Sequence, residues 1–230
     1  MHILAGLGTL LLTGATLTWL WQRNSAERQR MAELMGLPPV QDEVTEEGKD
    51  AVRDADRLWQ RLMLRGQING YQASVWQRFW YLSPGDSRPY LRMPFCMFAF
   101  RLPALAPVQL IIEPQGLAED VPPLVSRWST WQTGDPAFDV EARTTSPQPA
   151  QAAAWLSPEL RGYVLDFFKR FACDDPLNYR TDLRRAVLGW FEVETMRVTY
   201  TTFGQTDQAS AKRLLCAVPV LSELARAASL

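Results

Sequence analysis

The feature that most constrains this chain is an uncharged, proline-free apolar run over residues 3–21, which reads ILAGLGTLLLTGATLTWLW. As a helix, a run of this length rises about 28 Å, close to the roughly 30 Å thickness of a bilayer's hydrocarbon core. The run ends at Trp19 and Trp21, whose indole rings suit the headgroup region, and Arg23 follows. We therefore predict a transmembrane anchor over residues 1–22, in contact with the lipid bilayer through residues 3–21.

A cleaved signal peptide is the alternative interpretation of this run. Its n-region would be Met1 and His2 only, without lysine or arginine, and tryptophans stand where a cleavage site needs small residues. These features favour an uncleaved signal-anchor. Positive charges follow the run and none precedes it, so the positive-inside rule places the C-terminal side in the cytoplasm. The prediction is a single-pass protein of the bacterial inner (plasma) membrane with a cytoplasmic soluble domain.

Small residues share one face of this predicted membrane helix, at spacings of four, four and three: Ala5, Thr9, Thr13 and Thr16. Such a stripe lets another transmembrane helix approach closely. Small residues are also common in any membrane span. Helix–helix contact through these residues, and with it a homo-oligomer, is therefore a hypothesis that a genetic dimerisation or cross-linking assay would test.

Composition restricts what the soluble part can do. With 47% hydrophobic and 21% charged residues, the chain is globular, and its formal net charge of −1 gives no reason to expect a nucleic-acid partner. The cysteines Cys96, Cys173 and Cys216 are too far apart for a zinc or redox motif, which predicts buried thiols in a reducing compartment. His2 is the only histidine, so Ser-His-Asp and Cys-His catalysts and histidine metal sites are excluded from the soluble domain of a single chain.

Glycine and proline mark the end of the first helix after the anchor. Residues 26–35 are expected to continue as a helix until Gly36, since glycine suits a C-cap and Pro38 and Pro39 cannot extend a helix. A polar, acidic linker follows. The predicted organisation is a transmembrane anchor (1–22), a juxtamembrane helix with an acidic linker (23–48) and a cytoplasmic α+β domain (49–230).

Apolar periodicity changes along the domain. Spacings of three and four residues predict a helix over residues 46–64, and the turn signal Asn69-Gly70 then opens a region of aromatic and β-branched runs. Ser157 followed by Pro158 is typical of a helix start. The strands are expected at residues 71–82, 91–102 (with Pro94 at an edge or a bulge), 108–113, 124–132 and 138–144, followed by a hairpin over 187–203.

A last helix is expected after Thr206, which we predict to be its N-cap, with a kink at Pro219. The order of elements is then helix, antiparallel strands, helix, hairpin and helix. This order predicts an α+β fold in which helices pack on a mostly antiparallel sheet, behind an N-terminal transmembrane helix.

A basic, aromatic hairpin over residues 65–101 is the first candidate site. It interleaves arginines with aromatic residues and contains a single acid, Asp86. Such a surface could rest on anionic headgroups close to the anchor, or stack single-stranded nucleic acid. Alternating strands that bury the aromatic residues and expose the arginines explain the same pattern more simply. The residues proposed for membrane-surface contact are Arg65, Arg78, Arg88, Arg92, Trp76 and Trp80.

Carboxylates are the remaining candidates for chemistry: Glu113, Glu119, Asp120, Asp135, Asp139, Asp174 and Asp175. Paired carboxylates can act as acid and base if the fold holds them close together. Nothing in their spacing shows that two of them meet, and Asp135-Pro136 is ordinary turn chemistry. The chain has no GxGxxG, P-loop, GxSxG or CxxC motif. We therefore predict no enzyme activity, no catalytic or metal-binding residue and no cofactor.

Several short segments resemble a loosely defined family of bacterial membrane-anchored proteins that share a domain of unknown function. The similar segments are Gly70-Tyr71, Phe79-Trp80-Tyr81, Phe98 to Leu102, Phe138-Asp139-Val140 and Leu156-Ser157-Pro158-Glu159-Leu160, within about residues 66–228. The family's order of a hairpin, a Phe-Asp strand, a helix, a closing hairpin and a final helix implies the same α+β fold. It implies no activity, cofactor or site residue. The single N-terminal anchor of this chain departs from the family pattern.

These observations predict a membrane-anchored scaffold or accessory subunit that acts through contacts with an unknown protein partner at the cytoplasmic face. The alternative is a peripheral, lipid-contacting adaptor that uses the hairpin over residues 65–101. A hydrolase that relies on carboxylates alone is the third hypothesis.

Overall fold

The computed structural model describes residues 25–40, 59–82, 91–115, 128–173, 188–204 and 207–229. Within these residues the chain forms one 8-stranded sheet in which every neighbouring pair is antiparallel, in the order β1-β2-β3-β8-β7-β4-β6-β5. The α+β prediction is confirmed. The strands are β1 (Trp59–Ile68), β2 (Tyr71–Leu82), β3 (Leu91–Arg101), β4 (Leu110–Pro114), β5 (Ser129–Trp131), β6 (Ala142–Ser146), β7 (Trp190–Glu194) and β8 (Arg197–Phe203). The helices are residues 25–35, α3 (Pro136–Glu141), α4 (Pro149–Trp155), α5 (Pro158–Cys173) and α7 (Gln208–Ala228).

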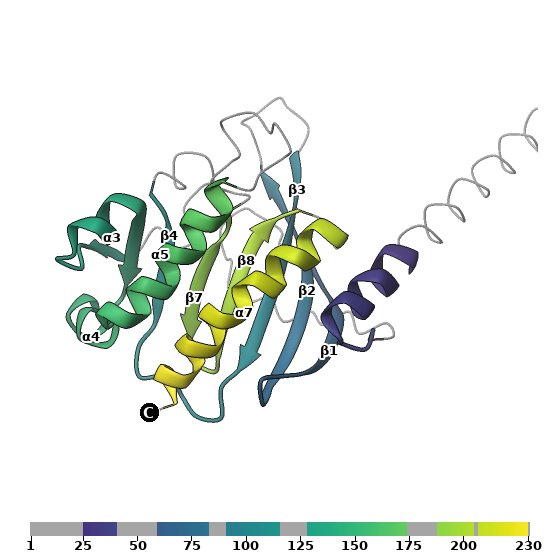
Figure 1. Cartoon of the computed structure of the whole chain (residues 1–230), viewed down its shortest axis with the longest axis horizontal. Helices are drawn as coiled ribbons and strands as arrows, with labels where there is room; N and C mark the ends of the chain where they lie inside the picture. The colour runs from purple at the N-terminus through teal and green to yellow at the C-terminus, as the bar shows by residue number, and fades with distance from the viewer. Residues whose placement is uncertain are drawn as a thin grey trace, which may run out of the picture.

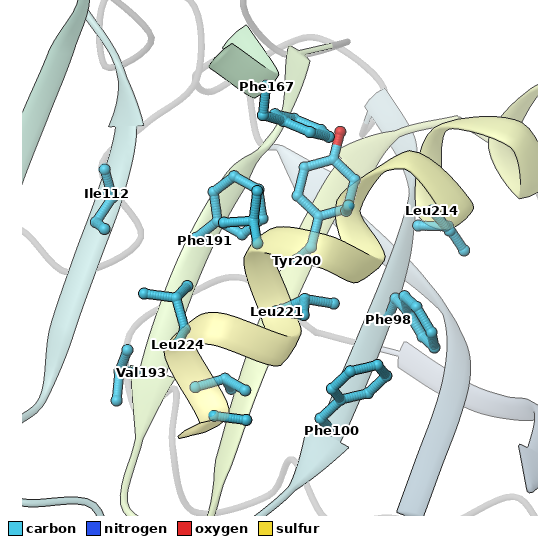
Figure 2. Close-up of a cluster of buried hydrophobic side chains, with 14 of the residues drawn as sticks. Phe98, Phe100, Ile112, Phe167, Phe191, Val193, Tyr200, Leu214, Leu221 and Leu224 are labelled. Atoms are coloured by element: carbon cyan, nitrogen blue, oxygen red, sulfur yellow. The ribbon is translucent and has the colours of Figure 1, made fainter. Parts of the chain in front are cut away.

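Helix 25–35, α7 and α5 lie side by side over one face of the sheet (Figure 1). Between them and the strands lies the main core, in which aromatic rings meet edge to face. The Phe167 ring centroid of α5 is 5.1 Å from those of both Phe191 on β7 and Tyr200 on β8. Leu214, Leu221 and Leu224 of α7 complete this cluster (Figure 2). Burial of these large apolar side chains supplies most of the free energy that holds the helices on the sheet.

The β1–β2 hairpin turns at Asn69 and Gly70, as the sequence predicts. Both residues have positive φ, 51° and 83°. A two-residue loop with this geometry matches the twist of the flanking strands, and asparagine and glycine tolerate it best. The predicted strands over residues 71–82, 91–102 and 108–113 and the predicted hairpin over 187–203 are also confirmed.

The helix predicted over residues 46–64 is wrong at its C-terminal end, because residues 59–64 belong to β1; residues 41–58 lie outside the described part. A β-bulge between Leu62 and Leu64 explains the error. The bulge turns both Met63 and Leu64 toward the main core, whereas Leu62 packs with Trp76 and Met97 in a second cluster. All three are therefore buried, at 8%, 0% and 1% exposure. Three consecutive apolar residues do not show the alternation of a regular strand, so their pattern also fits the apolar face of a helix.

Residues 37–40 protect the free edge of β1. The Arg65 N–H donates to the Pro38 carbonyl (3.1 Å), and the Val40 N–H donates to the Met63 carbonyl (3.0 Å). Gly66 lies where this segment crosses, since a Cβ there would be 2.8 Å from Leu37 Cδ2. Glycine at position 66 therefore leaves room for the segment that covers an otherwise unpaired strand edge.

The strand predicted over residues 138–144 is also wrong in its first half. Asp135 is the N-cap of α3, with its carboxylate accepting from the Ala137 and Phe138 N–H groups, and Pro136 takes the first helical position. Strand β6 begins only at Ala142. The short helix α4 has no counterpart among the predictions, and of the strand expected at residues 124–132 the structure describes β5 alone.

Pro94 was expected at an edge or a bulge, but β3 is an interior strand between β2 and β8. The Pro94 carbonyl accepts from the Gly204 N–H (3.0 Å), just past Phe203, where β8 ends. The proline nitrogen faces the same side, because the N–H and C=O of a strand residue point to the same neighbour. Because β8 has already ended at this point, the missing N–H of Pro94 removes no hydrogen bond between β3 and β8. The Gly204 carbonyl accepts from Gln77 Nε2 (3.4 Å) in place of a proline N–H.

The C-terminal helices follow the predictions closely. Ser157 Oγ accepts from the Leu160 N–H (3.3 Å) at the start of α5. The N-cap of α7 is Asp207, whose carboxylate accepts from the Ser210 N–H (2.7 Å), rather than Thr206. Pro219 lies inside α7 on its exposed side.

Helix 25–35 belongs to the α+β domain. Met31 and Met35 are 0% and 5% exposed and lie in the main core with Leu37. The helix ends at Gly36, which has a φ of 62°, as predicted. The structure therefore does not separate this segment from the domain at residue 49. In the part of the chain that the structure describes, no helix is long and apolar enough to cross a bilayer; residues 3–21, with the stripe of Ala5, Thr9, Thr13 and Thr16, lie outside that part.

Candidate functional site

An exposed apolar surface is formed by residues 102–107, between β3 and β4, and the β7–β8 turn at Thr195 and Met196. We call these residues the apolar tip. They meet because the β7–β8 hairpin is inserted between β3 and β4, so the connection from β3 to β4 must pass the end of that hairpin. Figure 1 shows this connection at the lower end of the sheet.

Backbone hydrogen bonds hold the two parts of the tip together. The Leu102 N–H donates to the Met196 carbonyl and the Ala106 N–H to the Thr195 carbonyl, both at 2.8 Å. Leu102 and Val108, on either side of the loop, are each 2% exposed and anchor it in the core. Side chains add further bonds. Gln109 Nε2 donates to Thr195 Oγ1 (2.9 Å), and Gln151 Nε2 donates to the Pro107 carbonyl (2.6 Å).

This rigid loop presents apolar side chains to solvent. Leu105 is 67% exposed and Met196 39%, and Pro103, Ala104 and Pro107 between the anchors are exposed as well. A single exposed leucine carries no information, because about half of any protein surface is apolar. A leucine and a methionine on a loop fixed by hydrogen bonds and prolines are different, because they present apolar surface that is already ordered before a partner arrives.

Charged residues border the tip at the ends of its strands. Arg101, the last residue of β3, is exposed and pairs in register with Arg197, the first residue of β8. Arg197 Nε donates to Glu194 Oε2 (2.7 Å), so this arginine is neutralised within its own hairpin. The tip is therefore an apolar loop next to one compensated and one exposed arginine.

Polar residues on β2, β7 and β8 also gather on the sheet face opposite to Tyr200. Trp190 Nε1 donates to Glu192 Oε1 (2.5 Å). Burial raises the pKa of Glu192 above its usual range and the neighbouring Glu194 adds to the rise, whereas Arg78 and Arg197 oppose it. Burial likewise lowers the pKa of Arg78, against the charge of Glu192. Both carboxylates therefore have cationic or N–H partners, which is a structural arrangement rather than a free acid–base pair.

The carboxylates singled out in the sequence have structural roles where the structure describes them. Glu113 pairs with Arg143 across β4 and β6; burial raises the pKa of Glu113, and the arginine opposes this rise. Asp135 caps α3 and pairs with Arg161 (3.3 Å). Asp139 accepts from the Thr133 N–H and hydroxyl, both at 2.9 Å, and from the Gly134 N–H (3.1 Å), which closes the loop before α3. Glu119, Asp120, Asp174 and Asp175 lie outside the described residues.

The basic aromatic hairpin is only partly a surface. Arg65 is exposed, but Trp76 is 7% exposed and packs with Leu62, Met97 and Ala99, while Arg78 is half-buried. In this fold Trp76 is not available for contact with lipid headgroups. Trp80 and Arg92 belong to β2 and β3, but their side chains, and Arg88 altogether, lie outside the described part.

The described residues offer little to a metal ion or a small ligand. No group of three or more histidine, cysteine, aspartate or glutamate side chains is placed there to hold a metal ion. A surface depression between helix 25–35 and the start of α7 is lined by Arg30, Glu33, Leu34 and Gln208, all of them exposed. Of the cysteines, Cys96 is buried, as predicted, and Cys216 is partly exposed; the side chain of Cys173 is not described.

Sequence reasoning missed the tip and the polar residues around Glu192. The alternation of Glu192 and Glu194 with Phe191 and Val193 predicts a strand with one polar face, but it does not show that these carboxylates are half-buried beside Trp190 and Arg197. Residues 103–107 carry the prolines of an ordinary loop. Only the insertion of the β7–β8 hairpin between β3 and β4 brings Leu105 to Met196, and no local pattern signals it.

The fold and these surfaces define a class: an α+β domain with a helix-covered antiparallel sheet and a preformed apolar tip. Comparison with protein-family models gives no match, and no curated protein sequence matches the chain. Among solved structures, the chain is similar to the mycobacterial trehalose monomycolate transport factor A, TtfA, with 12% sequence identity and a TM-score of 0.49. The similarity covers 89% of this chain and 95% of that chain. A likeness at this level carries no conclusion about what the present chain binds or does.

Proposed function

We propose that this chain is a membrane-anchored accessory subunit or scaffold, and that its α+β domain binds a protein partner through the apolar tip. The observation that carries the proposal is the exposure of Leu105 and Met196, 67% and 39%, on a loop held by backbone hydrogen bonds at both ends. Exposed apolar side chains on an already ordered loop suit a docking surface, because a partner that covers them has little ordering cost to overcome.

The position of the tip favours a protein over a lipid surface. The proposed anchor at residues 3–21 precedes helix 25–35, which lies at the right-hand side of Figure 1, whereas the tip lies at the lower end of the sheet. A domain tethered through that helix would direct the tip away from the bilayer. The alternative of a lipid-contacting adaptor is weaker because Trp76, which it requires at the surface, is buried and Arg78 is half-buried.

The remaining parts of the proposal come from the sequence. The anchor would hold the domain at the cytoplasmic face of a bacterial inner membrane, and the function would be binding rather than catalysis, without a cofactor. The resemblance to the family of bacterial membrane-anchored proteins fits this proposal and adds no activity to it.

Substitution of the tip in the full-length chain tests the proposal. Leu105→Glu is compared with Val140→Glu on α3, because Val140 is equally exposed, at 70%, but lies outside the tip. Each chain carries a C-terminal tag and is purified with its partners from detergent-solubilised membranes of the source organism. A partner of fixed stoichiometry should remain with the Val140→Glu chain and be lost from the Leu105→Glu chain, since a central contact contributes about 2 kcal/mol or more, roughly a 30-fold change in affinity. Equal recovery from both variants would refute docking at the tip.

A further inference from the structure

We infer that the segment that docks on the apolar tip is acidic as well as apolar, so that a carboxylate of the partner meets Arg101 while apolar side chains cover Leu105 and Met196. The inference rests on the proposed function and names the chemistry of the partner.

The charges around the tip are unequal. Arg101 and Arg197 face each other across β3 and β8. Glu194 takes Arg197 at 2.7 Å, and no carboxylate of the described residues pairs with Arg101. Like charges directly opposite on neighbouring strands destabilise a sheet. Glu194 compensates Arg197 alone, so Arg101 is an uncompensated cation beside an occupied ion pair, and a carboxylate from a partner would compensate it.

The other polar groups of the tip are already used. Gln109 donates to Thr195 Oγ1 and Gln151 donates to the Pro107 carbonyl, and the carbonyls of Thr195 and Met196 accept from the opposite loop. Arg101 is thus the polar side chain at the tip that a partner can engage without breaking an internal bond. A guanidinium binds a carboxylate in a planar, two-bond geometry, which adds direction to the apolar contact.

The geometry favours a short protein segment. Leu102 and Val108 anchor the loop and its hydrogen bonds fix it, so a small contact area can suffice because little ordering is needed on binding. An anionic membrane also combines negative charge with apolar surface. The tip lies at the lower end of the sheet in Figure 1, however, whereas helix 25–35, which follows the proposed anchor, lies at the right-hand side, and this arrangement points to a protein segment as the occupant.

Random 12-residue peptides displayed on phage are the probe, selected on the full-length chain in neutral detergent micelles. Enriched peptides should place aspartate or glutamate next to leucine, isoleucine, phenylalanine or methionine. Their affinity should fall about tenfold or more for Leu105→Glu and for Arg101→Glu. It should be unchanged for Val140→Glu and for Arg170→Glu, a charge reversal at an exposed position on α5. Replacing the acidic residue of the peptide by lysine should restore binding to the Arg101→Glu chain.

Several outcomes would overturn the inference: no enriched peptide, enriched peptides without an acidic bias, or peptides that bind the Arg101→Glu chain as well as the unmodified one. Flotation of the full-length chain, reconstituted in neutral vesicles, with anionic vesicles provides the lipid arm. Arg101-dependent co-flotation, without peptide binding, would assign the tip to a membrane surface. If Leu105→Glu releases the natural partner and Arg101→Glu does not, docking at the tip stands and only the acidic character of the partner is refuted.

Discussion

Gly189 sits directly before β7 at a position where any side chain would collide with β8. Its φ is +71°, and a Cβ built there would lie 2.2 Å from the Thr201 carbonyl oxygen and 2.9 Å from Tyr200 Cε2. The first of these contacts is with backbone, so no side-chain rotation can relieve it. Replacing Gly189 by alanine must therefore push β7 and β8 apart at the centre of the sheet.

The cost follows from two terms. Placing alanine in the left-handed region costs about 1 kcal/mol, and forcing extra volume into a packed site costs about 1–3 kcal/mol. Alanine also lowers the conformational entropy of the unfolded variant, which offsets about 0.5–1 kcal/mol of this cost. The net loss in the free energy of unfolding is about 1–3.5 kcal/mol, centred on about 2 kcal/mol, which is a large part of a total stability of about 5–15 kcal/mol.

Gly162 provides a matched control in the same molecule. It lies within α5, and a Cβ there would meet nothing within 4 Å. Alanine at this position should raise the free energy of unfolding by about 0.5–1 kcal/mol through helix propensity. Thermal unfolding of the full-length chain in micelles, followed by tryptophan fluorescence, should show a melting temperature about 5–10 °C lower for Gly189→Ala and slightly higher for Gly162→Ala. If Gly189→Ala is as stable as the unmodified chain, the close approach of β7 and β8 at this point is wrong.

Three further predictions concern buried groups. Arg143→Met removes the charge that opposes the raised pKa of Glu113, so the folded pKa should rise further. The free energy of unfolding of the variant should fall by about 2–3 kcal/mol at pH 7, where the carboxyl of Glu113 is ionised in the unfolded chain. Below the ordinary glutamate pKa of about 4.3 the decrease should be much smaller. A decrease that does not depend on pH in urea titrations would contradict this account. Burial raises the pKa of the Cys96 thiol to about 12. Iodoacetamide at pH 8 should therefore modify the partly exposed Cys216 first, and equal rates of labelling by peptide mass spectrometry would refute the buried position of Cys96. Asp139→Ala removes the acceptor of the Thr133 and Gly134 N–H groups and should cost about 1–2 kcal/mol in urea unfolding, whereas an unchanged midpoint would show that these bonds add no net stability.

Sequence reasoning succeeds in this chain where structure is set locally. Asn69-Gly70 specifies its hairpin and Ser157-Pro158 its helix start, because the required dihedral angles and capping bonds involve only neighbouring residues. Asp135-Pro136 carries the same helix-start chemistry as Ser157-Pro158. Its interpretation as a turn followed by a strand missed a signal that the sequence contains.

The bulge at Leu62–Leu64 could not be predicted in this way. Its register depends on pairing with Trp76 and Val75 of β2, and three adjacent buried residues fit a helix equally well until that pairing is known. The apolar tip has the same origin, because Leu105 and Met196 are brought together by strand order alone. Long-range pairing of strands, rather than local propensity, decides both features.

Docking of a protein on the apolar tip is tested most directly by cross-linking in living cells. A photoreactive amino acid is placed at position 105 of the full-length chain, and at the equally exposed position 140 as the control. The proposed function predicts a discrete protein adduct at position 105 that is absent at position 140. Adducts at neither position, the same adducts at both, or lipid adducts at position 105 would contradict it.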